Sequence, residues 1–100
     1  MKQYWVYLLL CSDGSYYTGV TNNIDRREWE HNSGIVECAY THSRRPVKLV
    51  YADVHTDINQ AIAWEKHVKG WSRAKKRALA AGEWGRIKAL AHRHGPIGDR

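Results

Sequence analysis

The stretch YWVYLLLCSDGSYYTGVTNNIDRREWEH, residues 4–31, decides the fold, and it opens with eight apolar or aromatic residues, 4–11. A segment of this length and content predicts a β-strand. Ser12-Asp13-Gly14-Ser15 then has the composition of a tight turn, because Asp and Gly tolerate the backbone angles that a hairpin requires. A second strand follows with Tyr16-Tyr17-Thr18. The stretch therefore predicts a β-hairpin with tyrosines on both strands, in a register that the residues do not fix.

A short helix is predicted after the hairpin, over residues 24–32, with Asn22-Asn23 as N-cap candidates and Gly34 at its end. Arg27 and His31 are four residues apart, so they share one face of this helix. The same face carries Ile24. A cation and an imidazole therefore lie where a helix normally buries hydrocarbon, which is unusual for a purely structural helix.

The rest of the chain predicts one more strand and three more helices. Residues 34–46 read as a loop or irregular segment, and β-branched and aromatic residues predict a strand over 47–54. Helices are expected over 57–70 and 72–82, each with an N-cap residue at its start and a glycine at its end, and over the amphipathic segment 84–94.

Glu65 is the most informative residue of the later helices. A helical wheel places it near the centre of an apolar arc formed by Ile58, Ala61, Ile62 and Val68. A buried carboxylate is costly unless a cation, hydrogen bonds or a metal ion compensate it. Its spacing leaves two interpretations open, namely a salt bridge to Arg27 or another base, and a metal ligand.

Composition favours a single folded domain with an anionic partner. The chain has 100 residues, 43% hydrophobic and 26% charged, with a net charge of +6 and a pI near 9.6. Six basic residues and no acid fall within residues 66–77, around Trp71, and a basic run with an aromatic suits phosphate contacts and base stacking. The alternative is a solvated helix face.

Neither a membrane protein nor a disulfide-rich protein is expected. The apolar N-terminal segment is too short to cross a bilayer, and no other segment is long enough. Cys11 and Cys38 have no metal-binding spacing and suggest no disulfide framework, so we expect two free thiols and a cytoplasmic location.

An ordered set of short motifs resembles the GIY-YIG nuclease superfamily, and most closely its small stand-alone bacterial single-domain members of the UPF0213 type. The motifs cover about residues 4–79: Val6-Tyr7, Tyr17-Thr18-Gly19, Arg27, His31, Tyr40-Thr41, Arg44-Arg45-Pro46-Val47, Glu65, Lys69-Gly70-Trp71-Ser72-Arg73 and Lys75-Lys76. The resemblance implies an α/β domain of the α+β type, in which a three-stranded antiparallel sheet is flanked by helices in the order β-β-α-β-α-α. Residues 1–82 would form the nuclease-like domain and residues 83–100 its C-terminal helix and tail.

The function that the resemblance implies is Mg²⁺- or Mn²⁺-dependent endonucleolytic cleavage of DNA, directed by structure or damage, in repair or recombination. It makes Tyr7 the general base, with Tyr17 and His31 positioning water and phosphate, Arg27 binding phosphate oxygens and Glu65 holding the metal ion. Nucleic-acid contacts are expected at Gly19, Arg44, Arg45, Lys66, Lys69, Trp71, Arg73, Lys75 and Lys76.

Two departures from the family pattern bear on these expectations. Glu28 takes a position that is commonly apolar in relatives, which predicts weaker docking of the first helix. The surroundings of Tyr40-Thr41 are less basic than usual, which puts substrate contacts by that segment in doubt. The alternatives are a non-catalytic or weakly catalytic module that binds DNA or RNA through the basic run 66–77, and a protein-interaction adaptor; as the nucleic-acid partner, DNA is expected more than RNA. The oligomeric state and a recruiting protein partner are open.

Overall fold

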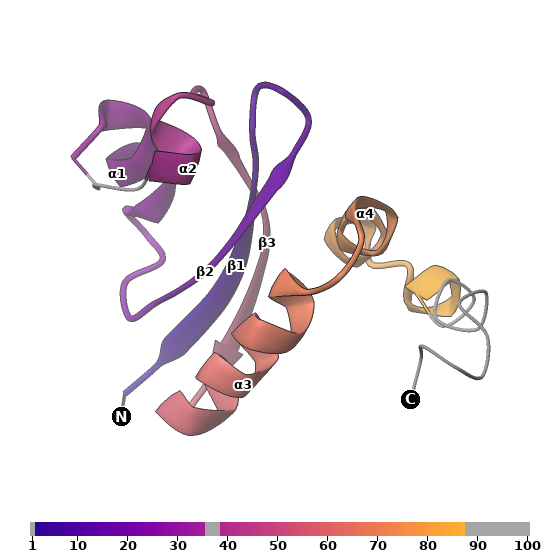
Figure 1. Ribbon diagram of the computed structural model, residues 1–100. Helices are drawn as coiled ribbons and strands as arrows, with labels where there is room; N and C mark the ends of the chain where they lie inside the picture. The colour runs from indigo at the N-terminus through magenta and orange to yellow at the C-terminus, as the bar shows by residue number, and fades with distance from the viewer. Residues whose placement is uncertain (1, 36–38, 88–100) are drawn as a thin grey trace.

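A computed structural model describes residues 2–35 and 39–87 of the chain. Its elements run in the order β1 (Tyr4–Leu10), β2 (Tyr16–Thr21), α1 (Arg27–Ser33), α2 (Ala39–His42), β3 (Lys48–His55), α3 (Ile58–Lys69) and α4 (Arg73–Ala81). Figure 1 shows the sheet between α1 and α2 on one side and α4 on the other. The predicted mixed fold, with a three-stranded antiparallel sheet and flanking helices, is confirmed.

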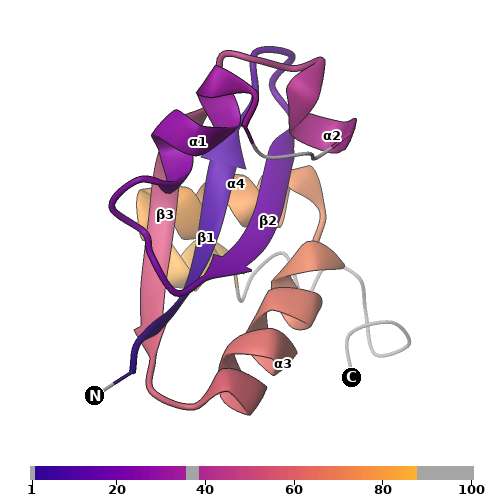
Figure 2. The same cartoon turned by 90° about the vertical axis from the view of Figure 1, so that its left-hand side faces the viewer.

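The apolar first strand lies at the centre of the sheet. The strand order is β2-β1-β3, and both pairings are antiparallel. Figure 2 shows β1 between β2 and β3. In the register of β1 with β2, Tyr7 is opposite Gly19 and Leu9 is opposite Tyr17. Side chains of directly opposite residues lie on the same face of a sheet. Tyr7 and Tyr17 therefore share a face.

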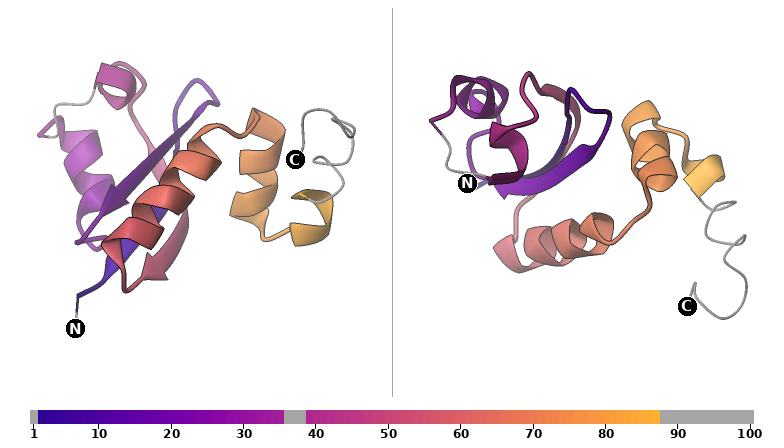
Figure 3. Two further views of the ribbon diagram at one scale, coloured as in Figure 1. Left: turned by 60° about the horizontal axis from the view of Figure 1, so that its bottom comes forward. Right: turned by 45° about the horizontal axis from the view of Figure 1, so that its top comes forward.

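Alternation along β1 divides the buried residues between the two faces. Tyr7 and Leu9 pack with Cys11 and Val47, on the side of α1. Leu8 packs on the other side, in a cluster with Val68 of α3 and with Ala78 and Leu79 of α4. The two views of Figure 3 show α3 and α4 together, on the face that α1 and α2 leave free. The domain thus has a small core on each face of one sheet.

The first helix begins later than predicted, at Arg27 instead of residue 24. The backbone N–H of Asn23 donates to the hydroxyl of Thr21, and the N–H of Arg27 donates to the carbonyl of Ile24. These bonds form turns in place of the expected asparagine cap. The predicted loop also contains a short helix, α2.

The ends of the later helices agree with the prediction. The side chains of Asp57 and Ser72 accept hydrogen bonds from backbone N–H groups at the starts of α3 and α4. α4 ends at Gly82, which has a left-handed φ of 74° that favours glycine.

The predicted C-terminal helix lies only partly within the described residues. Residues 84–87 are helical, and Ile87 is buried in the cluster around Leu8. Leu90 and Ala91 of the expected apolar stripe lie outside the described residues, as does Cys38. Cys11 is a buried free thiol. The division of the domain at residue 82 stays a prediction. Among the described residues, no helix has the length and apolar character needed to cross a bilayer.

Candidate catalytic site

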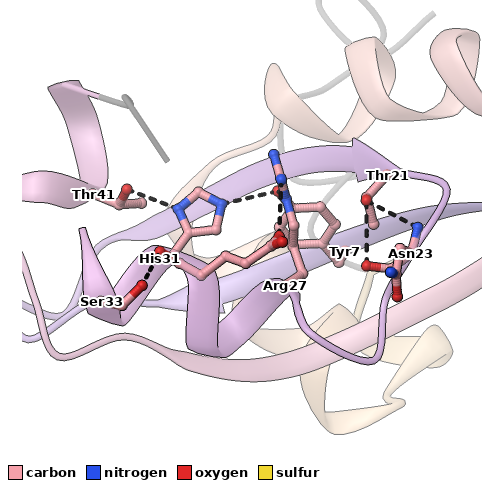
Figure 4. A network of polar contacts seen from close by, with 8 residues as sticks. Tyr7, Thr21, Asn23, Arg27, His31, Ser33 and Thr41 are labelled. Atoms are coloured by element: carbon pink, nitrogen blue, oxygen red, sulfur yellow. Dashed lines mark hydrogen bonds and ion pairs between the residues drawn. The ribbon is translucent and has the colours of Figure 1, made fainter. Parts of the chain in front are cut away.

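The centre of the site is the hydroxyl of Tyr7, a fully buried residue on the central strand. Arg27 Nε donates a hydrogen bond to this hydroxyl at 3.0 Å, and His31 Nε2 lies 3.2 Å from it (Figure 4). Arg27 and His31 are one turn apart on α1, on the face that the sequence predicted. The structure therefore joins three of the five predicted catalytic residues by direct hydrogen bonds.

Two polar side chains of α1 bond to the backbone at the start of β3 and so position the helix that carries Arg27 and His31. The carboxylate of Glu28 accepts a hydrogen bond from the backbone N–H of Leu49 at 2.6 Å. The Asn32 amide makes two bonds to the backbone of Val47, one to its carbonyl and one from its N–H. The expectation that Glu28 weakens the docking of this helix is wrong, because its carboxylate satisfies a strand N–H at the bulge of β3.

Gly19 makes room for the ring of Tyr7. A Cβ atom at residue 19 would lie 2.5 Å from the hydroxyl oxygen of Tyr7, and 3.0 Å from a ring carbon of Tyr17. A real Cβ atom cannot approach other atoms so closely, so a side chain here would displace the two tyrosines. Its predicted contact with nucleic acid stays a prediction, and the structure supplies an independent reason for the glycine.

Tyr17 extends the cluster toward solvent. Its ring centroid lies 5.3 Å from that of His31 and 6.2 Å from that of Tyr7. Tyr40 of α2 lies on its far side, at 6.0 Å, and the guanidinium of Arg44 stacks over Tyr40 at 4.2 Å. These aromatic and cationic groups form a continuous layer from the buried phenol to the surface.

The pKa values of His31 and Arg27 differ from those of the same groups in water. Burial lowers the pKa of His31, and the neighbouring Arg27 cation lowers it further. For Arg27, burial acts to lower the pKa, but hydrogen bonds to Tyr7 and Glu30 outweigh it and raise the pKa overall. At neutral pH the site therefore combines a neutral imidazole with a fixed cation.

These groups can move a proton from the phenol. Arg27 stabilises a phenolate at Tyr7 through its charge and its hydrogen bond, and the neutral His31 can accept the proton. The side chain of Arg27 is 25% exposed and also pairs with Glu30 at 3.3 Å. Arg27 is therefore a partly exposed hydrogen-bond partner of a buried phenol.

Glu65 is held separately, on α3. It lies in a buried stripe with Ala61 and Val68, as predicted, whereas Ile58 and Ile62 of the expected arc are exposed. Its carboxylate pairs with Lys69 at 3.0 Å, so the base that compensates it is Lys69 and not Arg27.

The donor set at Glu65 fits a hard divalent cation that keeps most of its waters. Within residues 2–35 and 39–87, no group of three metal-ligating side chains occurs. Mg²⁺, however, is commonly bound by one or two carboxylates together with waters and substrate phosphates. The side chain of Lys69 is 59% exposed, so a metal ion could replace it at the carboxylate.

The predicted nucleic-acid contacts divide into two groups. Arg44 and Arg45 already bond within the protein, Arg44 to the Asp13 carboxylate and Arg45 to the carbonyls of His42 and Asn32. The second group lies on α3 and α4 and the turn between them, where Lys66 is exposed and Lys75 stacks over Trp71 at 4.4 Å.

α4 also lines an open groove of about 690 Å³, whose charged residues are Arg73, Arg77, Glu83 and Arg86. Arg77 belongs to the basic run of residues 66–77, whereas sequence reasoning did not single out Arg86 as a contact. The i,i+4 spacing of Arg73 and Arg77 is a signal that places both on one face of the helix.

Thr41 is the other residue that sequence reasoning passed over as a functional group. It is buried on α2, and its hydroxyl lies 2.9 Å from Nδ1 of His31. No spacing rule predicts this contact, because it joins two separate helices, α1 and α2.

Comparisons with known proteins show the family of the chain. A family model described as the GIY-YIG catalytic domain matches residues 3–78. A UPF0213 protein of Syntrophus aciditrophicus is 46% identical over 79 residues, which cover 79% of this chain and 91% of that protein. A UPF0213 protein of Listeria monocytogenes is 43% identical over 77 residues, which cover 77% and 85%.

Solved structures show the same fold. The solution NMR structure of a UPF0213 protein from Bacillus halodurans has a TM-score of 0.52 and 38% identity, covering 90% of this chain and 95% of that one. A second NMR structure, of a protein from E. faecalis, has a TM-score of 0.53 and 30% identity, covering 94% and 88%.

Proposed function

The chain belongs to the GIY-YIG catalytic domain family, and from that premise we propose that it is a metal-dependent endonuclease that hydrolyses phosphodiester bonds in DNA. The observation that carries the proposal is the hydroxyl of Tyr7, held between the guanidinium of Arg27 and the neutral imidazole of His31. A buried phenol with a cation on one side and a proton acceptor on the other is arranged for proton transfer, which simple packing does not require.

In this proposal Tyr7 acts as the base, or relays the proton, that activates the attacking water. Free tyrosine has a pKa of about 10, so it needs a neighbouring cation to act near neutral pH. Arg27 is that cation, and its remaining N–H groups suit the oxygens of a phosphodiester. Tyr17 borders His31 and Tyr40, where it would position the water and the phosphate. Since Tyr7 is fully buried, neighbouring side chains have to shift before substrate reaches the phenol.

Glu65 would hold the divalent ion, Mg²⁺ or Mn²⁺. When bound, such an ion supplies Lewis-acid stabilisation of the phosphoryl oxygens and of the leaving 3′ oxygen. The carboxylate is largely removed from water and is neutralised by a lysine that can move away.

We propose that the substrate is a DNA structure or lesion that arises in repair or recombination. The proposal includes a protein partner that recruits the nuclease to that DNA. The described domain has little surface for reading a long sequence, so recognition of shape is favoured. Its basic groove on α4 suits contacts to the phosphate backbone.

A module that binds nucleic acid with little cleavage is the second candidate. The observation in its favour is that the groove on α4 and the stacked pair of Trp71 and Lys75 belong to α4 and the turn before it, on the sheet face opposite Tyr7. Binding through that face does not need the phenol at all.

Cleavage of a panel of single-stranded, duplex, flapped and branched DNA and RNA separates the two candidates. We expect Mg²⁺- or Mn²⁺-dependent nicking of at least one DNA substrate by the wild type, and a loss of at least 100-fold in Glu65→Gln and Arg27→Met. Affinity is measured in parallel without metal. Salt-dependent binding with no metal-dependent cleavage of any substrate would support the binding module instead.

A further inference from the structure

Thr41 makes a contact with the candidate site that the proposed mechanism has not used. Its hydroxyl lies 2.9 Å from Nδ1 of His31, and both residues are 1% exposed. Figure 4 shows the contacts as one chain, from Thr41 through both ring nitrogens of His31 to Tyr7 and Arg27. Thr41 thus occupies the end of the chain opposite the Arg27 cation.

The direction of the hydrogen bonds in this chain follows from the guanidinium. An arginine side chain can only donate, so the Tyr7 oxygen accepts from Arg27 Nε. The phenolic proton then points elsewhere, and His31 Nε2, at 3.2 Å, is placed to accept it. A neutral imidazole carries one proton, so with Nε2 as acceptor the proton lies on Nδ1, facing the Thr41 oxygen.

We propose that Thr41 is a positioning residue that fixes His31 in the tautomer whose Nε2 faces Tyr7 as a proton acceptor. The Thr41 oxygen accepts the Nδ1 proton in a site with little access to water. When His31 takes the proton of Tyr7, both ring nitrogens become donors, and Thr41 still satisfies one of them. Burial and Arg27 both lower the pKa of His31, so a fixed acceptor at Nδ1 offsets part of the cost of that protonated state.

The expected effect of Thr41 on cleavage rests on the proposed endonuclease function, whereas its expected effect on the tautomer of His31 does not. The test therefore begins with long-range ¹H–¹⁵N NMR of the imidazole nitrogens at pH 7.5, with the His31 signal assigned by its loss in His31→Gln. We expect a protonated Nδ1 and an unprotonated Nε2 in the wild type and in Thr41→Ser. In Thr41→Val, which has a similar shape and no hydroxyl, we expect a mixture of tautomers.

The second readout is cleavage of the best DNA substrate of the panel. Thr41→Val should lower kcat about tenfold with KM unchanged, and Thr41→Ser should restore most of the loss. The proposal is overturned if wild-type His31 is protonated at Nε2, or if Thr41→Val keeps the wild-type tautomer and kcat. A shifted tautomer in a protein that cleaves nothing would confirm the positioning role and reject the nuclease function alone.

Discussion

Gly19 allows the Tyr7 ring to pack in the site because it has no side chain. A methyl group at this position would lie 2.5 Å from the Tyr7 hydroxyl oxygen and 2.6 Å from the ring carbon that bears it. We therefore expect Gly19→Ala to destabilise the domain by about 1–3 kcal/mol, as measured by urea unfolding.

Gly85→Ala is the matched control, because a Cβ atom there meets nothing within 4 Å and the residue is helical. It should leave stability unchanged or raise it slightly, since alanine is the better helix former. Equal stabilities for the two variants would show that the Tyr7 ring does not occupy the space above Gly19.

His31 makes the stability of the domain depend on pH in a defined direction. Because its pKa is lowered in the folded state, the unfolded chain binds more protons as the pH falls through the ordinary histidine range. The stability contributed by the neutral imidazole is therefore complete above pH of about 6.5 and is lost progressively below it.

The corresponding measurement compares urea unfolding of the wild type with that of His31→Gln at pH 8, 7, 6 and 5. The stability advantage of the wild type should be constant at pH 8 and 7 and should shrink toward pH 5. An advantage that grows on acidification would mean that His31 is protonated in the folded site.

For single residues, the sequence predicted which side chains belong to the site better than it predicted which of them are in contact. The spacing of Arg27 and His31 on one helical face, and the two tyrosines of the hairpin, indicated the cluster that the structure brings together. The contact of Tyr7 with Gly19 depends on strand register, which the alternation of residues leaves open. The contact of Thr41 with His31 depends on how two helices pack, and local pattern carries no information on that.

Among the elements, α3 carries the carboxylate assigned to the metal ion and also its competitor. Lys69 pairs with Glu65 one turn away, and since the lysine side chain is 59% exposed, solvent screening keeps the contribution of the pair to about 1 kcal/mol. A divalent ion has to displace Lys69 from the carboxylate. We therefore expect Lys69→Met to increase the affinity for Mn²⁺ by up to about fivefold in isothermal titration calorimetry.

Lys66→Met is the control, because it removes the same charge from an exposed position of the same helix. It should change the Mn²⁺ affinity by less than Lys69→Met does. If Glu65→Gln still binds Mn²⁺ as the wild type does, the metal is held elsewhere.

Elements with strong local signals were predicted well, and elements that depend on tertiary contacts were not. The caps of α3 and α4 were readable because Asp57 and Ser72 bond to backbone groups two or three residues away. The start of α1 was predicted too early, since the bonding of Thr21 to Asn23 competes with an asparagine cap. The role of Glu28 was wrong because its partner, the N–H of Leu49, belongs to a distant strand.

At the scale of the described domain, the three-stranded sheet separates the Tyr7 cluster from the basic groove on α4. One face holds the hydrogen-bonded cluster of Tyr7, Arg27 and His31, and the other holds α4 with its basic groove. Composition and charge predicted the basic run, but only the three-dimensional arrangement shows that the groove and the phenol belong to opposite faces. Variants of the α4 groove should therefore change the affinity for nucleic acid without disturbing the hydrogen bonds of Tyr7.

The most direct measurement of the central claim is the rate of DNA cleavage by Tyr7→Phe compared with Tyr16→Phe. Both variants lose one hydroxyl from the same hairpin, but Tyr16 packs on the face opposite Tyr7. With Mg²⁺ and saturating substrate, we expect Tyr7→Phe to lower kcat at least 100-fold and Tyr16→Phe to change it less than threefold, both variants remaining folded. Equal rates for folded Tyr7→Phe and the wild type would contradict the account, because no proton would then pass through the Tyr7 hydroxyl.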